Sequence, residues 1–383
     1  MGLYVLVLCG LLIVLVSVIK QWKLLLLLVL LFAASAAVLL WYSMSEKGGG
    51  SGNIPAEKEI ESVHILYGTE KKGLLKDPEF QEILRKKHGI VIKGTKADGF
   101  EISESDIQGI DGIWPSTDIA ALFFKKQHPD AQYKTGNIFH TPVVFYSWPE
   151  VTDTLIRQGI VEKRKNLYAV TNMKKLLEMG NRTWESLRLS GQNGLIIIQS
   201  PDPGKSNAGF LMAGLTAAVL NNENIEGHLS EIQKIYKRMK PLEPSPDTLF
   251  NRYIKQGRWA FPLISACENQ IIEFYHAFPN YQNKIRTQVR VLIPEPTVLS
   301  EHPFLALTKK GESLLTALQS PDIQKLAWQR FGFRSGVEGI DNDPGELEKI
   351  GLTGQIRSLI SLPSPQVMDE IIAILEKNDE NKE

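Results

Sequence analysis

The chain is organised around a pattern of hydrophobic and polar positions at residues 194–220. Residues 195–198, Leu-Ile-Ile-Ile, form a β-branched apolar run that predicts a buried strand. A proline–glycine break follows at 200–205, and residues 210–220 are rich in helix formers. A strand, a tight turn and a helix that starts with small polar residues offer backbone N–H groups and a positive helix end to a ligand. Such residues also cap helices that bind nothing, so the pattern leaves both roles open.

Two long apolar segments open the chain, at residues 2–19 and 24–42. Each is long enough to cross about 30 Å of hydrocarbon as a helix. The residues between them are Lys-Gln-Trp-Lys, whereas a signal peptide would have its basic residues first. We therefore expect a transmembrane helical hairpin over 1–45, with its turn in the cytoplasm, and a flexible linker over 46–57. This predicts a multi-pass protein of the cell membrane whose C-terminal domain is extracytoplasmic.

Strand patterns alternate with helix patterns after residue 58. Strands are predicted at 62–67 and 89–92, with a helix at 78–88 between them, and this order favours a parallel sheet in an α/β fold. A strand end and turn follow at 110–117. Further strands are expected at 141–146, 289–293 and 302–307, and further helices at 119–124, 149–159, 168–179, 229–239, 246–256, 270–278, 312–318, 321–331 and 367–375.

Composition and motifs exclude several function classes. The chain has 43 basic and 43 acidic residues, so its formal net charge of zero favours no nucleic-acid partner. Cys9 and Cys267 form neither a disulfide framework nor a CxxC motif, and the seven histidines lack metal-ligand spacing. No GxSxG elbow surrounds Ser206, and residues 204–206 lack the upstream glycine of a phosphate-binding loop. We expect no enzymatic activity, no metal and no cofactor.

The turns and strands of the chain carry a resemblance to a known family. The stretches concerned are Tyr67-Gly68-Thr69, Trp114-Pro115-Ser116, Thr141-Pro142-Val143-Val144, 200–209 and 294–303. In this order they resemble bacterial extracellular solute-binding proteins, and within that group the type II periplasmic binding fold that includes the molybdate- and sulfate-binding proteins. The resemblance covers roughly residues 58–335.

The resemblance implies two α/β lobes joined by two crossing strands, with a ligand held between the lobes on helix starts and strand-end turns. The implied parts are lobe one over about 58–141 and 294–335 and lobe two over about 142–290. Beyond the resemblance, we expect a C-terminal helical extension and tail over 336–383.

The same resemblance implies which turns line the cleft. Hydroxyls and backbone N–H groups suit an oxyanion, but carboxylates beside a dianion are unfavourable, so a cationic, zwitterionic or polyol ligand stays open. Glu268 equally well caps its own helix. The candidate ligand contacts are Thr69, Glu70, Trp114, Ser116, Thr117, Ser206, Asn207, Ala208, Glu268 and Glu295.

These features together predict a function. We expect a membrane-anchored extracytoplasmic solute-binding protein that captures a small polar ligand for transport or sensing. Its partner would be an ABC-type permease or another protein of the same membrane. The alternative is a non-catalytic scaffold or sensor domain that binds a membrane protein partner in place of a solute.

Overall fold

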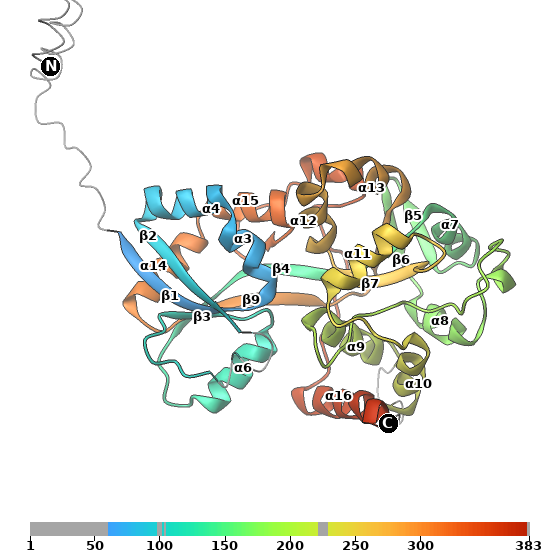
Figure 1. The fold of residues 1–383 in the computed structure, drawn as a ribbon, viewed down its shortest axis with the longest axis horizontal. Helices are drawn as coiled ribbons and strands as arrows, with labels where there is room; N and C mark the ends of the chain where they lie inside the picture. Colours follow the sequence, from blue (N-terminus) through green and yellow to red (C-terminus); the bar gives the residue numbers. More distant parts are fainter. Residues whose placement is uncertain (1–59, 98–101, 103–104, 221–228, 381–383) are drawn as a thin grey trace, which may run out of the picture. The chain divides into compact units, whose positions relative to one another are not determined.

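A mixed sheet runs through the part of the chain that the computed structural model describes, residues 60–97, 102, 105–220 and 229–380 (Figure 1). Its strands are β1 Glu61–Tyr67, β2 Ile90–Lys96, β3 Gly112–Trp114, β4 Lys134–Ser147, β5 Val161–Arg164, β6 Leu167–Val170, β7 Leu263–Cys267, β8 Arg290–Pro294, β9 Leu299–Ala306 and β10 Arg334–Ser335. Their order is β2-β1-β3-β9-β4-β8-β6-β5, and β7 and β10 also pair with β4. β1 is parallel to β2 and β3, as predicted, whereas β9 is antiparallel to β3 and β4.

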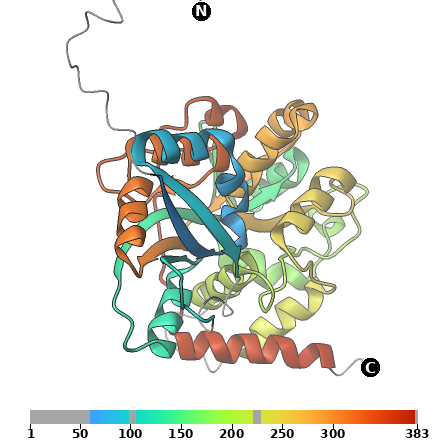
Figure 2. The same ribbon diagram turned by 60° about the vertical axis from the view of Figure 1, so that its left-hand side comes forward.

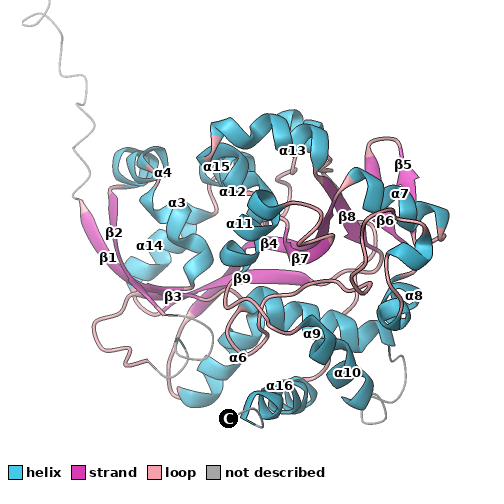
Figure 3. Ribbon diagram, turned by 45° about the vertical axis from the view of Figure 1, so that its right-hand side comes forward, coloured by secondary structure: helices cyan, strands magenta, loops and turns pink. Residues whose placement is uncertain are grey.

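β4 joins the two halves of the sheet (Figure 3). Its N-terminal part pairs antiparallel with β9, and its C-terminal part pairs with β7 and β8. Strands rise by about 3.3 Å per residue, so β4 is long enough to belong to both halves. Residues 143–146, Val-Val-Phe-Tyr, are all fully buried, as expected for a strand that is covered on both faces.

Each half of the sheet has its own hydrophobic core. We use "lobe one" for the part built on β1, β2, β3, β9, β10 and the first half of β4, and "lobe two" for the part built on β5 to β8 and the second half of β4. Trp114, Phe139 and Phe304 belong to a core in lobe one, and Val144 and Ile271 belong to the larger core of lobe two. The residue boundaries that the sequence suggests for the lobes stay a prediction.

Capping side chains and prolines fix where many helices begin. Asp77 accepts hydrogen bonds from two backbone N–H groups of α4, and Thr117, Ser245 and Thr308 each cap one further helix. The helical segments of lobe one are η1 Thr69–Lys71, α3 Lys72–Lys76, α4 Pro78–Ile83, η2 Leu84–His88, α6 Asp118–Gln127, α14 Lys309–Leu318 and α15 Pro321–Phe331. Those packed with lobe two are α7 Pro149–Arg157, α8 Met173–Glu178, η3 Met179–Asn181, η4 Glu185–Leu187, α9 Asn207–Leu220, α10 Leu229–Met239, α11 Pro246–Gln256, α12 Asn269–Ala277, η6 Pro279–Tyr281, α13 Gln282–Gln288, η7 Gly345–Ile350 and α16 Pro365–Glu380.

The prediction of a buried strand at 195–198 is wrong. This stretch is extended but pairs only through isolated bridges, from Leu195 to Thr183 and from Gln199 to Ile264. Ile196 and Ile198 are buried, which explains the apolar run without a continuous ladder. The helix predicted to follow is confirmed as α9, whose side chains are buried on nearly all sides.

One other predicted element differs in type. The helix expected at 168–179 begins as strand β6, and only its second half is the helix α8. The remaining predicted strands and helices are confirmed, although β4 and α16 are longer than the sequence pattern indicated.

No helix in the described part of the chain combines the length and the apolar character needed to cross a membrane. The transmembrane hairpin expected over 1–45, which contains Cys9, and the linker expected over 46–57 lie outside the described residues. Cys267, at the end of β7, is a buried free thiol.

The core of lobe one contains a histidine without a polar partner. The His302 side chain is fully buried against the ring of Phe333, and neither ring nitrogen has a hydrogen-bond partner among the described residues. Burial, with Lys71 and His140 nearby, holds the pKa of His302 well below its usual value of 6.5. Burial and Arg334 likewise lower the pKa of His140 to about 4.

We predict that His302→Leu raises the free energy of unfolding by about 1–2 kcal/mol at pH 7, because an unpartnered polar group leaves the core. At position 302, the unfolded chain binds more protons than the folded chain below pH 6.5. The contribution of His302 to stability therefore falls as the pH drops below 6.5 and is level above it. The variant lacks this contribution, so acidification should cost it less stability than it costs the wild type. Urea unfolding between pH 5 and 8 measures both effects, and a less stable variant with the wild-type pH slope would contradict them.

Candidate functional site

The turns that follow β1 and β3 lie side by side, because these parallel strands place Tyr67 opposite Trp114. The Gly68 N–H donates to the Trp114 carbonyl at 3.1 Å. A Cβ atom at position 68 would collide with Ser116 Oγ, so glycine is needed for this close approach. The carboxyl ends of parallel strands, where α/β folds bind ligands, therefore meet here.

Ser116 is the centre of a polar cluster in lobe one. Its hydroxyl donates to the Glu70 carboxylate and accepts a hydrogen bond from Lys71 Nζ at 2.8 Å. Lys71 is fully buried, and its Nζ also donates to the Pro115 carbonyl at 2.7 Å. Because burying an ammonium group is costly unless it has partners, these bonds fix the positions of Lys71 and Ser116.

Lobe two reaches this cluster through the start of α9. Asn207 Nδ2 donates to the Ser116 carbonyl at 3.1 Å and to Ser300 Oγ at 2.8 Å, and Ser300 Oγ donates to the same carbonyl at 2.6 Å. Ser206 Oγ accepts a hydrogen bond from the Gly209 N–H at 3.0 Å, so the side chain of the residue before α9 caps this helix. The predicted contacts that lie in this cluster or next to it in the chain are Thr69, Glu70, Ser116, Ser206 and Asn207.

Two carboxylates that the sequence analysis missed belong to lobe two, Asp247 on α11 and Glu273 on α12. Glu273 Oε1 lies so close to Gly73 of α3 that a Cβ atom there would collide with it. Burial, and then the charges of Asp247 and Glu70, raise the pKa of Glu273 to about 7. Asp247 accepts a hydrogen bond from Gln270 Nε2 at 2.8 Å. No local sequence pattern marks these residues, because only tertiary packing brings α11 and α12 to α3.

Three predicted contacts have structural roles. Trp114 is fully buried, with its ring centroid 5.6 Å from that of Phe139 and 6.0 Å from that of Phe304. Thr117 Oγ1 caps α6, and Ala208 is buried in the first turn of α9. Their apolar or capping environments account for these residues without a ligand.

The other two predicted contacts are in ion pairs. Glu268 is fully buried and accepts from Arg334 Nε at 2.5 Å and from Arg334 Nη2 at 2.8 Å, and its side chain does not cap α12. Glu295 accepts from Arg164 Nη1 at 2.9 and 2.7 Å. Both carboxylates therefore have guanidinium partners within the chain, and we do not propose them as ligand contacts.

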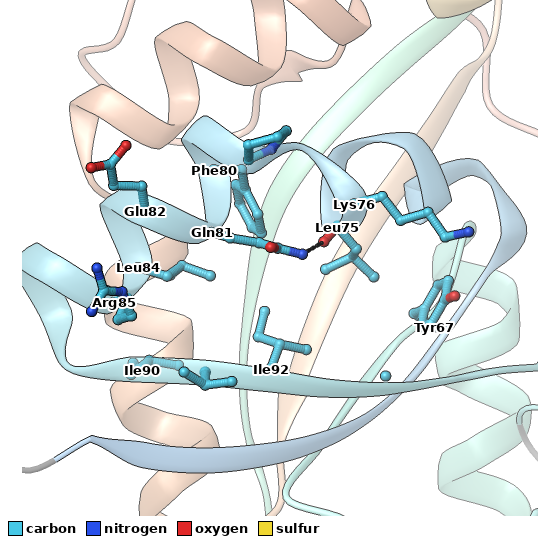
Figure 4. A pocket seen from close by; sticks show the side chains of 13 residues that line it. Tyr67, Leu75, Lys76, Phe80, Gln81, Glu82, Leu84, Arg85, Ile90 and Ile92 are labelled. Atoms are coloured by element: carbon cyan, nitrogen blue, oxygen red, sulfur yellow. Dashed lines mark hydrogen bonds between the residues drawn. The ribbon is translucent and has the colours of Figure 1, made fainter.

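A groove of about 510 Å³ lies elsewhere on lobe one, between β2 and the helices α3 and α4 (Figure 4). Leu75, Phe80 and Ile92 are among its apolar lining residues, and Gln81 Nε2 donates to the Leu75 carbonyl at 2.8 Å. None of the predicted ligand contacts lines this groove. It is therefore distinct from the polar cluster around Ser116.

Comparison with known proteins places the fold. Neither the family models nor the curated proteins compared with the chain match it. Apo ferric ion-binding protein A of Pasteurella haemolytica matches with a TM-score of 0.58 at 13% identity, over 84% of this chain and 98% of that one. An ABC-transporter substrate-binding protein of Agrobacterium tumefaciens has a TM-score of 0.53 at 13% identity, over 85% and 95%. A sulfate-binding protein of Mycobacterium tuberculosis has a TM-score of 0.50 at 15% identity, over 82% and 96%.

The chain has the type II periplasmic binding fold. At these identities the likeness shows the fold alone, and it confirms the resemblance found in the sequence. The matching structures are named as binding proteins, which agrees with the prediction of a non-catalytic chain.

The predicted localisation as a multi-pass protein of the cell membrane is contradicted by two findings. No described helix is suited to crossing a bilayer, and the similar structures are bacterial periplasmic solute-binding proteins. The prediction depended on the apolar segments at 2–19 and 24–42, which lie outside the described residues. We do not retain it.

We predict that Glu273→Gln stabilises the protein above pH 7 by about 1–3 kcal/mol and has little effect at pH 4.5. The Glu273 carboxyl has a pKa of about 7 in the folded chain and near 4.5 in the unfolded chain. Between these pH values the folded chain keeps the proton that the unfolded chain has lost. The contribution of Glu273 to stability therefore falls as the pH rises from 4.5 to 7, and the amide removes this loss. Urea unfolding at pH 4.5, 6 and 8 tests the difference, and an equal effect at all three values would contradict it.

Proposed function

We propose that this chain captures a small polar solute between its two lobes and delivers it to an ABC-type permease. The observation that carries the proposal is the convergence of polar groups from both lobes. Asn207 at the start of α9 meets Ser116, which Glu70 and Lys71 hold in lobe one. The type II periplasmic binding fold supports this reading, since the similar structures include a sulfate-binding protein and a substrate-binding protein of an ABC transporter.

In this proposal the lobes move relative to one another about β4 and about the connection between β8 and β9, with lobe boundaries near residues 141 and 294. Hinge closure of this kind bends a few connecting residues and leaves each lobe unchanged. The Asn207–Ser116 hydrogen bond belongs to the closed arrangement. A bound solute would form hydrogen bonds with the groups through which Asn207 and Ser116 are now bonded to each other.

The charges around Ser116 bear on the class of solute. Lys71 and the N-terminus of α9 favour an anionic group, as the oxyanion hypothesis requires. Glu70 and Glu273 oppose a bare dianion, because like charges repel in a buried site. A zwitterionic or polyhydroxyl solute satisfies both sets of groups, and we propose this class over a free oxyanion.

A second candidate function is a scaffold or sensor whose domain binds a membrane protein partner in place of a solute. The observation in its favour is that polar groups of the cluster already have partners within the chain, since Asn207 Nδ2 donates to the Ser116 carbonyl and the Ser116 hydroxyl donates to Glu70. The two candidates differ in a simple way, because only the first requires saturable binding of a small molecule.

We predict that a zwitterionic or polyhydroxyl compound stabilises the full chain against thermal unfolding, by about 2.7 kcal/mol at a concentration 100 times its Kd. The panel should contain amino acids, polyols, amines, sulfate and molybdate. Ser116→Ala and Asn207→Ala should each weaken binding about tenfold, the effect of one lost hydrogen bond.

The control for this experiment is Lys163→Ala, an exposed change in β5 that should leave affinity unchanged. Stabilisation by sulfate or molybdate alone would contradict the proposed solute class. No response to any compound in the panel would count against solute capture and favour the second candidate.

A further inference from the structure

The chain continues beyond β10 in a long segment that crosses from one side of lobe two to the other. We call residues 336–380 the C-terminal strap. It includes η7, which contacts α13, and it ends in α16, which packs on α9 and α10. Figures 1 and 2 show α16 running along the face of the molecule that α9 and α10 form.

The strap is attached at a buried ion pair between parts of both lobes. Arg334 on β10 is 1% exposed, and its guanidinium binds both oxygens of the Glu268 carboxylate at the start of α12. Arg334 also donates hydrogen bonds to the strap, from Nη1 to the Gly354 carbonyl at 3.0 Å and from Nη2 to the Thr353 carbonyl at 2.5 Å. The guanidinium also stacks on Trp328, 4.7 Å from the ring centroid. Arg334 therefore joins lobe one, lobe two and the strap at one point.

The strap next binds the connection between β8 and β9. The Thr297 N–H donates to the Ser358 carbonyl at 3.0 Å, and the Ile360 N–H donates to the Thr297 carbonyl at 2.9 Å. Thr297 Oγ1 donates to the Val143 carbonyl of β4 at 2.6 Å. Both chain crossings between the lobes are thus tied to the strap through Thr297.

The end of the strap is held on lobe two by apolar packing against the middle of α9. Met368, Ile371 and Leu375 on α16 are buried. Leu362 and Met368 lie so close to Gly214 of α9 that a larger residue there would displace them. The strap therefore has three separate attachments: the Arg334 pair, Thr297 and the surface of α9.

We propose that the C-terminal strap restrains the hinge and sets the angle between the lobes, with Arg334 as the positioning residue that holds it. Bending at β4 and at residues 295–298 changes the distance between Thr297 and Arg334, and the strap is hydrogen-bonded to both. Opening of the lobes consequently requires the strap to release at least one of these contacts. This restraint goes beyond solute capture and does not depend on the identity of a solute.

The test measures the interlobe distance by electron spin resonance. Spin labels are attached to the full chain at Lys309→Cys in lobe one and Lys174→Cys in lobe two, both exposed, in a Cys9→Ser background that leaves only the buried Cys267. The parent chain should give one narrow distance distribution. Arg334→Lys keeps the charge but loses the forked bonds to Glu268 and the strap, and it should add a second population shifted by several ångströms.

A second variant and a matched control make the test decisive. Met368→Ala loosens α16 and leaves the Arg334 pair intact, and it should broaden the distribution in the same way even where Arg334→Lys fails to fold. Arg252→Lys makes the same substitution in a pair with Glu243, for which the described residues show no hydrogen bond to the strap, and it should keep the narrow distribution. A single narrow distribution in the folded Met368→Ala variant would overturn the proposal.

Discussion

The hydrogen-bond ladder along β4 is the constraint on which the rest of the structure depends. One strand pairs with β9 and β10 in lobe one and with β7 and β8 in lobe two. Because the side chains at 143–146 are buried, the register of this strand cannot slip without exposing apolar surface. The ladder thereby fixes where the turns after β1 and β3 stand relative to the start of α9.

Charged groups inside this frame are paired and define positions. Lys71 is held by the Pro115 carbonyl and Ser116, and Arg334 is held by Glu268 and two strap carbonyls. Buried ion pairs add little net stability compared with apolar packing, but loss of one partner is costly. Both groups therefore act chiefly by specifying geometry, one at the interlobe cluster and the other at the proposed hinge.

The interlobe cluster and the hinge are connected through α9. The helix start carries Asn207, which meets Ser116, while the body of the same helix packs under Leu362 and Met368 of the C-terminal strap. Thr297, between β8 and β9, is hydrogen-bonded to the strap and to β4. A change in the angle between the lobes therefore affects the polar cluster and the strap together.

The sequence by itself determined the fold class, most helices and strands, and three members of the polar cluster, Glu70, Ser116 and Asn207. The helices and strands follow from local rules of periodicity, capping and turn chemistry, which act over a few residues, whereas the type II fold and the three cluster residues were implied by the resemblance to solute-binding proteins. Only the tertiary structure decided that residues 195–198 lack a ladder, that Trp114 is a core residue, and that Glu268 and Glu295 face arginines. Arg334 lies 66 residues from Glu268, and Glu273 faces Gly73 on a distant helix. Such partners are chosen by packing between remote segments, and no local pattern records that choice.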